Sequence, residues 1–335
     1  DAVNYLSEIW LNNEVVGYHE GGFTPFEFRV DNMIQAGKEN ILTLRVVGPI
    51  ILSDKNIDGV GALQTPQWRG GISGGIWQNV RLIASGNSYI KEVFIEPNIK
   101  DNTATFHLTL DHAAIKSEQI EVEICLKEAV NKENQVASHS ELLKLKPGLN
   151  HHKVVVQIPD AQYWSPNDPF LYQATVSLKN QQKISDDWHH RFGLRALTIK
   201  DQDFYLNEKR IYIKATFFEG LYPNGIAHPD SDEMVRKEIR LAKEAGFNMI
   251  RPWRHPMPPM WLDLADEMGI MVVGSPALEC MGLPLSSPYL PSRVTREVEQ
   301  TILKDRNRTC IVQWELFNEL HRPVLNQLMR PMAML

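Results

Sequence analysis

The sequence has no excess of basic residues and no long apolar run. Lys and Arg number 35 against 41 Asp and Glu, which gives a formal net charge of −6. This balance provides no extended basic face of the kind that nucleic-acid-binding proteins use to contact phosphates. The longest stretch without a charged residue, Cys280 to Ser292, has 13 residues and three prolines, too few to cross a bilayer. We therefore expect neither nucleic acid nor membrane among the partners.

Cysteine is equally scarce. Cys125, Cys280 and Cys310 lie far apart and form no CxxC pair, so the sequence predicts neither a disulfide framework nor a zinc ribbon. The histidine pairs 151–152 and 189–190 have no further ligand candidates nearby, and we expect surface residues there. No metal and no cofactor are predicted.

A length of 335 residues without an internal repeat predicts two or three domains, and 43% hydrophobic residues are enough to build their cores. Residues 1–89 have the pattern of an all-β region. Two apolar segments flank Asn12-Asn13, a dipeptide that tolerates the positive φ of a tight hairpin turn. Residues 41–47 form a further strand-like segment.

Residues 90–197 alternate between apolar and polar side chains. This period of two predicts half-buried antiparallel strands at 104–110 and 120–126, with further strands at 153–158 and 172–178. About 100 residues of short strands suit an immunoglobulin-like β-sandwich.

Residues 198–335 alternate between strand and helix patterns, which indicates parallel βαβ units and hence an α/β barrel or a doubly wound sheet. The expected helices cover residues 231–245, 259–269 and a segment capped by Ser292. The expected strands cover residues 211–215, 247–251, 270–273 and 311–317.

The last of these strands ends in Asn318-Glu319. Catalytic groups of a β/α barrel lie at the carboxyl ends of its strands. A carboxylic acid beside an amide suits glycoside hydrolysis, because the acid can protonate the leaving oxygen while the amide bonds a sugar hydroxyl. On this dipeptide alone, a helix N-terminal Asn followed by a solvated Glu is the competing interpretation.

The neighbourhood of this dipeptide resembles a known family. Residues 306–319, RNRTCIVQWELFNE, are similar to the acid/base strand of glycoside hydrolase family 2, which includes β-galactosidases, β-glucuronidases and β-mannosidases; Arg308 and Thr309 replace the usual His-Pro. Four more segments resemble the same family in family order: 10–26 and 70–82 its sugar-binding jelly roll, 163–172 the end of its immunoglobulin-like domain, and 192–207 its entry into the barrel.

The resemblance implies a multidomain fold and a site. The fold comprises a partial jelly roll at 1–89, an immunoglobulin-like sandwich at 90–197, and the N-terminal half of a (β/α)8 TIM barrel at 198–335. Glu319 is the implied general acid/base and the substrate is a terminal β-linked carbohydrate. The implied substrate-binding residues are Asn318, Arg251, His255 and Glu279. Trp314 is a further candidate, which could stack on a sugar face; a place in the core is its alternative. A plain ion pair at Arg251 and a loop histidine at His255 are the alternatives, and the histidine stands one position later than is usual.

A retaining glycosidase also needs a second carboxylate as nucleophile. No Asp or Glu follows Glu319, and residues 198–335 suffice for about four βα units. The first residues, Asp1-Ala2-Val3, include neither an initiator methionine nor a signal peptide. We therefore expect a fragment of a longer glycosidase that is inactive alone. The alternative is a non-catalytic carbohydrate-binding or scaffold protein with a degenerate barrel.

Overall fold

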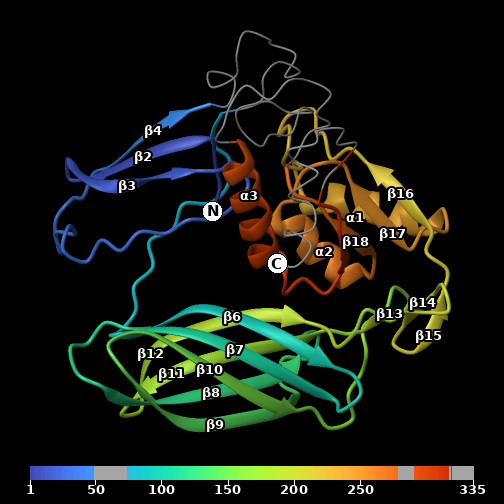
Figure 1. The fold of residues 1–335 in the computed structure, drawn as a ribbon, viewed down its shortest axis with the longest axis horizontal. Helices are drawn as coiled ribbons and strands as arrows, with labels where there is room; N and C mark the ends of the chain where they lie inside the picture. The colour runs from blue at the N-terminus through green and yellow to red at the C-terminus, as the bar shows by residue number, and fades with distance from the viewer. Residues whose placement is uncertain (49–73, 278–289, 317, 319–335) are drawn as a thin grey trace.

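The computed structural model describes residues 1–48, 74–277, 290–316 and 318. Within these residues the chain forms an N-terminal β-region (β1–β5), a sandwich (β6–β12) and an α/β region (β16–β19 with α1–α3), which Figure 1 shows as separate bodies.

The N-terminal β-region contains a three-stranded antiparallel sheet in the order β3-β2-β4 and the pair β1-β5. Asn12 and Asn13 adopt φ values of 52° and 67°, which confirms the hairpin turn predicted between two strands. The strands of this partial jelly roll are β1 (Val3–Asn4), β2 (Leu6–Leu11), β3 (Glu14–Glu20), β4 (Leu42–Val47) and β5 (Gly75–Ile76).

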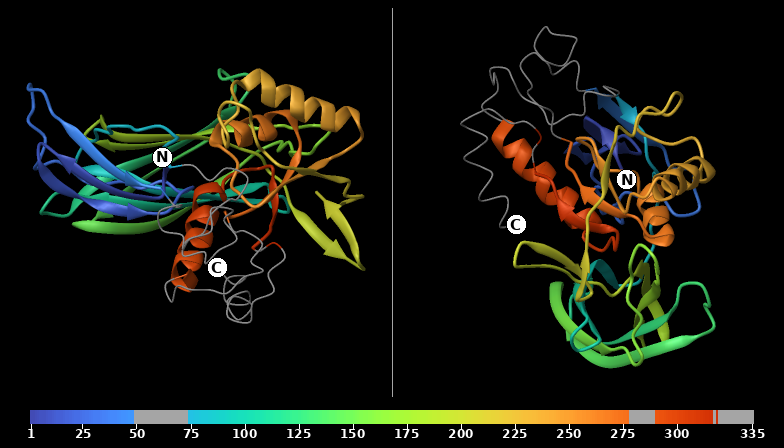
Figure 2. Two further views of the ribbon diagram at one scale, coloured as in Figure 1. Left: turned by 90° about the horizontal axis from the view of Figure 1, so that it is seen from above. Right: turned by 90° about the vertical axis from the view of Figure 1, so that its right-hand side faces the viewer.

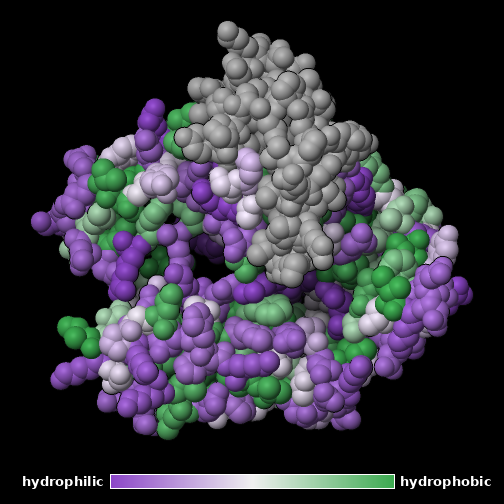
Figure 3. Space-filling view, in the orientation of Figure 1, coloured by the Kyte–Doolittle hydropathy of each residue, from purple (hydrophilic) through white to green (hydrophobic). Residues whose placement is uncertain are grey.

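The sandwich packs the antiparallel sheet β10-β7-β6 against the sheet β12-β11-β8-β9. Every second residue of β7 from Ala104 to Leu110, and of β8 from Ile120 to Leu126, is buried, as the alternation predicts. The outer surface seen in Figure 3 is mainly hydrophilic. The strands are β6 (Ser88–Asn98), β7 (Thr103–His112), β8 (Glu118–Glu128), β9 (Gln135–Leu145), β10 (Gly148–Gln157), β11 (Tyr172–Asn180) and β12 (Lys183–Phe192).

A small antiparallel sheet, β13-β14-β15, connects the sandwich to the α/β region. The predicted strand at residues 211–215 is wrong, because Ile211 pairs with Phe204 in this sheet and the first parallel strand starts only at Ala215. The apolar run is thus divided between two sheets. The bounds are β13 (Leu197–Lys200), β14 (Asp203–Leu206) and β15 (Lys209–Ile211).

The α/β region has four parallel strands in sequential order, β16-β17-β18-β19. A doubly wound sheet reverses its strand order, so this order is that of half a TIM barrel. The elements are β16 (Ala215–Phe218), α1 (Asp232–Glu244), β17 (Met249–Pro252), α2 (Pro259–Met268), β18 (Met271–Gly274), α3 (Leu290–Asp305) and β19 (Ile311–Trp314).

The helix ends follow local capping chemistry with one exception. The Ser231 hydroxyl accepts from the Met234 backbone N–H, and Gly269 ends α2 at a φ of 71°, the latter as predicted. The prediction that Ser292 caps α3 is wrong, since this helix begins at Leu290 and includes Ser292 in its first turn. The strand predicted for residues 311–317 ends at Trp314.

Helix α3 lies between the N-terminal β-region and the parallel sheet in the view of Figure 1, and the right-hand view of Figure 2 shows it along one side of the sheet. The Glu20 carboxylate is 2.6 Å from Arg293 and 3.6 Å from Arg296 of this helix. The Thr24 hydroxyl donates to the Gln300 side chain at 2.9 Å. These polar contacts attach the first β-region to the helix that leads into β19.

Candidate active site

The carboxyl ends of β17 and β19 bring together three polar residues that are up to 67 positions apart in sequence. Arg251 lies near the end of β17, Glu315 directly follows β19, and Asn318 lies three residues further on. Parallel pairing of β17 with β18 and of β18 with β19 places these ends at one edge of the sheet. This is the edge at which a β/α barrel carries its functional groups.

Arg251 binds both other residues. Its Nε donates to Glu315 Oε2 at 2.9 Å, and its Nη2 donates to Glu315 Oε1 and, at 2.6 Å, to Asn318 Oδ1. The Glu315 side chain is only 15% exposed, against 32% for that of Arg251. A forked arginine–carboxylate pair with little solvent access fixes both side chains more firmly than a single exposed contact does.

Trp314, another predicted substrate-binding residue, packs over Gly274 at the end of β18. A Cβ on this glycine would lie 2.5 Å from two atoms of the indole ring, so the glycine is what admits the ring here. Trp314 is partly buried and contacts the core formed by the sheet and its helices. The structure therefore gives Trp314 a packing role whether or not it also contacts a sugar.

His255 does not join the Arg251 group. The side chain is fully buried, and its ring nitrogens lie 3.0 Å from the Pro256 carbonyl and 3.2 Å from the Glu219 carbonyl. Burial lowers the pKa of His255 to about 4, so the ring is neutral at pH 7.

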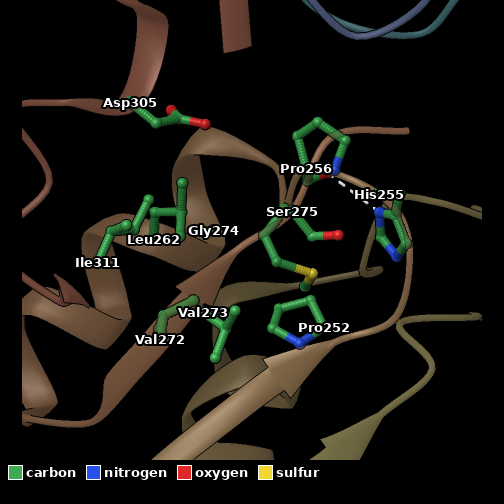
Figure 4. Close-up of a pocket in the computed structure, with 11 residues that line it drawn as sticks. Pro252, His255, Pro256, Leu262, Val272, Val273, Gly274, Ser275, Asp305 and Ile311 are labelled. Atoms are coloured by element: carbon green, nitrogen blue, oxygen red, sulfur yellow. Dashed lines mark hydrogen bonds between the residues drawn. The ribbon is translucent and has the colours of Figure 1, made fainter. Parts of the chain in front are cut away.

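The His255 ring borders a small, mostly apolar pocket, where Ser275 and Asp305 supply the other polar side chains (Figure 4). Figure 4 shows the bond between the His255 ring and the Pro256 carbonyl at the rim of this pocket. The hydrogen bonds described for His255 are thus with backbone carbonyls, and its ring centroid also lies 6.5 Å from that of Phe23.

Glu319 and Glu279 lie outside the described residues, so their predicted roles stay predictions. Within the described ranges, no group of three or more His, Cys, Asp or Glu side chains could hold a metal ion. None of the helices described there is long and apolar enough to cross a membrane.

The residues that precede β19 attach it to the sandwich. Asn307 Nδ2 donates to the Val93 carbonyl at 2.7 Å, while Asn307 Oδ1 accepts from the Ile95 N–H at 2.9 Å. Arg306 forms an ion pair with Glu92 of the same strand, β6. The segment that resembles the family's acid/base motif is therefore also an interdomain contact.

Two side chains hold the residues directly before β19. Arg195 Nε donates to the Thr309 carbonyl at 2.7 Å, and Asp266 accepts from the Cys310 N–H at 2.6 Å. Burial raises the pKa of Asp266 to about 6, and nearby Arg308 opposes that rise. β19 is thus positioned by residues from both the sandwich side and α2.

The sequence interpretation missed Glu315, Gly274 and the contact role of Asn307. The available signal for Glu315 was its position four residues before Glu319 within the same motif, as a carboxylate on the same segment. Nothing local indicated that Arg251 would be its partner.

A β-region followed by a β-sandwich and four parallel β/α strands with a polar carboxyl edge defines a multidomain protein of the TIM-barrel class. The chain belongs to glycosyl hydrolases family 2. The model of that family's sugar binding domain matches residues 1–85, the family 2 model itself matches 88–195, and the TIM barrel domain model matches 197–333.

Curated relatives include the β-galactosidase of Thermoanaerobacter pseudethanolicus, 28% identical over 320 residues, which cover 94% of this chain and 41% of the relative. A Yersinia pestis β-galactosidase is 25% identical, with 95% of this chain and 31% of the relative covered. The chain therefore spans well under half the length of these relatives.

Solved structures share the fold at lower identity. A putative β-galactosidase from Bacteroides fragilis superposes with a TM-score of 0.83 at 18% identity, covering 99% of this chain and 50% of that one. A Bacteroides uniformis β-glucuronidase gives a TM-score of 0.81 at 20% identity, with coverages of 100% and 41%. A β-galacturonidase from Eisenbergiella tayi, bound to galacturonate, gives 0.81 at 21% identity, with coverages of 99% and 58%.

Proposed function

We propose that this chain is part of a glycoside hydrolase that removes terminal β-linked sugars with retention of configuration. The observation that carries the proposal is the placement of Asn318 at the carboxyl end of the fourth parallel strand, in contact with Arg251. The names of the relatives, β-galactosidase, β-glucuronidase and β-galacturonidase, support a β-glycoside as substrate. We assign residues 1–89 to the sugar-binding-like jelly roll, 90–197 to the immunoglobulin-like sandwich, and 198–335 to the barrel.

In this mechanism Glu319 starts the cycle protonated and gives its proton to the leaving oxygen. A second carboxylate, about 5–5.5 Å away, attacks the anomeric carbon and forms a glycosyl-enzyme. Glu319 then takes a proton from water, whose oxygen attacks the anomeric carbon and displaces the carboxylate, so that the sugar is released. Residues 320–335 contain no acidic side chain, so we assign the nucleophile to a residue outside this stretch.

The remaining proposed residues orient the sugar. Asn318 bonds the 2-hydroxyl, a contact that strengthens in the transition state, and Arg251 holds Asn318. Glu279, Trp314 and His255 complete the proposed substrate site, His255 by supporting the backbone around it.

The test is Glu319→Gln in the whole protein. We expect this variant to lose turnover of glycosides with poor leaving groups, because no acid protonates the leaving oxygen. Activated aryl glycosides, which need little protonation, should still form the glycosyl-enzyme as an initial burst. Unchanged hydrolysis of a natural disaccharide by this variant would exclude Glu319 as the acid.

The competing function, carbohydrate binding without catalysis, predicts a different result. In that case the unsubstituted protein binds a sugar but hydrolyses none of a panel of aryl β-galactosides, β-glucuronides, β-galacturonides and β-mannosides. The same panel also identifies the preferred sugar of an active enzyme, because discrimination depends on polar contacts to individual hydroxyls.

A further inference from the structure

The contact with Arg251 determines which end of the Asn318 side-chain amide, the oxygen or the NH2, is turned away from the arginine. A guanidinium group only donates hydrogen bonds, so the Asn318 atom 2.6 Å from Arg251 Nη2 has to be the amide oxygen. The amide NH2 then lies on the opposite branch of the side chain. Arg251 thereby decides the orientation of Asn318.

The position of Arg251 depends in turn on Glu315. An arginine side chain has several rotatable bonds, and a forked carboxylate restricts them by binding Nε and Nη2 together. The two hydrogens of Nη2 are then divided between Glu315 and Asn318. Without the fork, the guanidinium can turn away and the amide of Asn318 can rotate by 180°.

Glu315 itself is on a rigid element. Its backbone N–H donates to the Gly274 carbonyl at 2.8 Å, which continues the pairing of β19 with β18 by one residue. A group on a sheet edge holds a partner to a closer geometry than a group on a loop does. The backbone of Glu315 is therefore held in place, and its carboxylate can orient Arg251 from a fixed position.

We infer that Glu315 is a positioning residue that acts through Arg251 to present the amide NH2 of Asn318, and not its oxygen, to the sugar 2-hydroxyl. The inference rests on the proposed function for the identity of the ligand, whereas the orientation of the amide follows from the contacts alone.

The kinetic test compares aryl β-glycosides with and without a 2-hydroxyl on the whole protein. With the 2-hydroxy substrate, Glu315→Gln should lower kcat/KM about tenfold to a hundredfold, as expected when a polar contact in the transition state is lost. With the 2-deoxy substrate, the same variant should hydrolyse as fast as the parent. In an Asn318→Ala background, Glu315→Gln should cause no further loss.

Glu244→Gln is the matched control, because Glu244 forms an exposed pair with Arg240 on α1, away from the sheet edge. It should behave as the parent with both substrates. Equal losses with the two substrates in Glu315→Gln would assign Glu315 a general structural role and overturn the inference.

A second measurement does not depend on activity. In nitrogen–proton correlation spectra, Glu315→Gln should shift the Asn318 side-chain amide and speed exchange of the Arg251 Nε proton, and Glu244→Gln should change neither. An unmoved Asn318 amide in Glu315→Gln would refute the inference even in an active enzyme. Inactivity of the parent on every glycoside, with the spectral changes present, would refute the proposed function and leave the orientation of Asn318 established.

Discussion

At the residue scale, the sheet edge depends on one residue without a side chain, Gly274, as well as on the charged Arg251 and Glu315. Gly274 has no side chain at the point where the Trp314 ring crosses β18, and the Glu315 N–H binds the Gly274 carbonyl. The glycine therefore serves both the tryptophan and the carboxylate that follows it. A methyl group added at this position would overlap the indole ring of Trp314, so the ring would have to move.

We predict that Gly274→Ala displaces Trp314 and costs about 1–3 kcal/mol of unfolding free energy, as overpacking typically does. Denaturant unfolding followed by tryptophan fluorescence measures this. Gly48→Ala is the control, because the nearest atom of the described residues, the Gly74 Cα, lies 3.5 Å from a Cβ there. Equal stability of the two variants would show that the ring moves aside freely.

At the scale of elements, the side-chain amide of Asn307 makes hydrogen bonds to β6 of the kind that a neighbouring strand would make. β6 is the outer strand of its sheet, and one side of its backbone has no strand partner among the residues that the structure describes. Asn307 supplies a donor to Val93 and an acceptor to Ile95 through one side-chain amide. An edge strand is thereby covered and β19 is attached to the sandwich by the same two bonds.

We predict that Asn307→Asp destabilises the protein by about 1–3 kcal/mol, because a carboxylate oxygen of similar shape then faces the Val93 carbonyl without a proton between them. Asn131→Asp, at an exposed position, makes the same chemical change and should have little effect. Chemical denaturation of both variants measures the two losses of unfolding free energy. A loss at position 307 no larger than at 131 would contradict the role of the amide.

At the scale of the whole molecule, α3 connects the N-terminal β-region to the parallel sheet through buried polar groups. Glu297 on this helix is almost completely buried, and burial raises its pKa to about 7. Between an ordinary carboxyl pKa near 4.5 and about 7, the native state keeps a proton that the unfolded state has released. The contribution of Glu297 to stability therefore decreases as pH rises through this range.

We predict that Glu297→Gln matches the parent near pH 4 and exceeds it above pH 7, by at most about 3 kcal/mol. Thermal unfolding midpoints across pH measure the difference. The variant has to be compared with the parent at each pH because other groups also titrate. Burial lowers the pKa of His19 to about 4, so the contribution of His19 to the stability of the protein decreases as pH falls, opposite to that of Glu297. Glu299→Gln, exposed on the same helix, is the control. A pH-independent difference for Glu297→Gln would contradict the assignment.

The sequence by itself determined the features that depend on neighbours along the chain. The period-two burial around Phe106 and Ile124, the Asn12-Asn13 hairpin and the end of α2 at Gly269 were predictable because side-chain alternation, positive φ and helix termination are local properties. The strand that precedes Asn318 was also predicted, but it ends at Trp314, four residues before Asn318 and not directly before it. The local pattern gave a wrong strand at residues 211–215, where one apolar run is divided between two sheets: Ile211 belongs to β15, and β16 starts at Ala215.

Only the tertiary structure decided which of these residues meet. Arg251 and Glu315 are 64 positions apart, and Asn307 and Val93 are 214 apart. No local propensity encodes such pairs, because they exist only after parallel strands align at one edge and the sandwich docks beside them. An ion pair at Arg251 was one alternative from the sequence, but no local pattern identified Glu315 as the partner. The folded sheet brings the two charges into contact because both lie at the carboxyl ends of their strands.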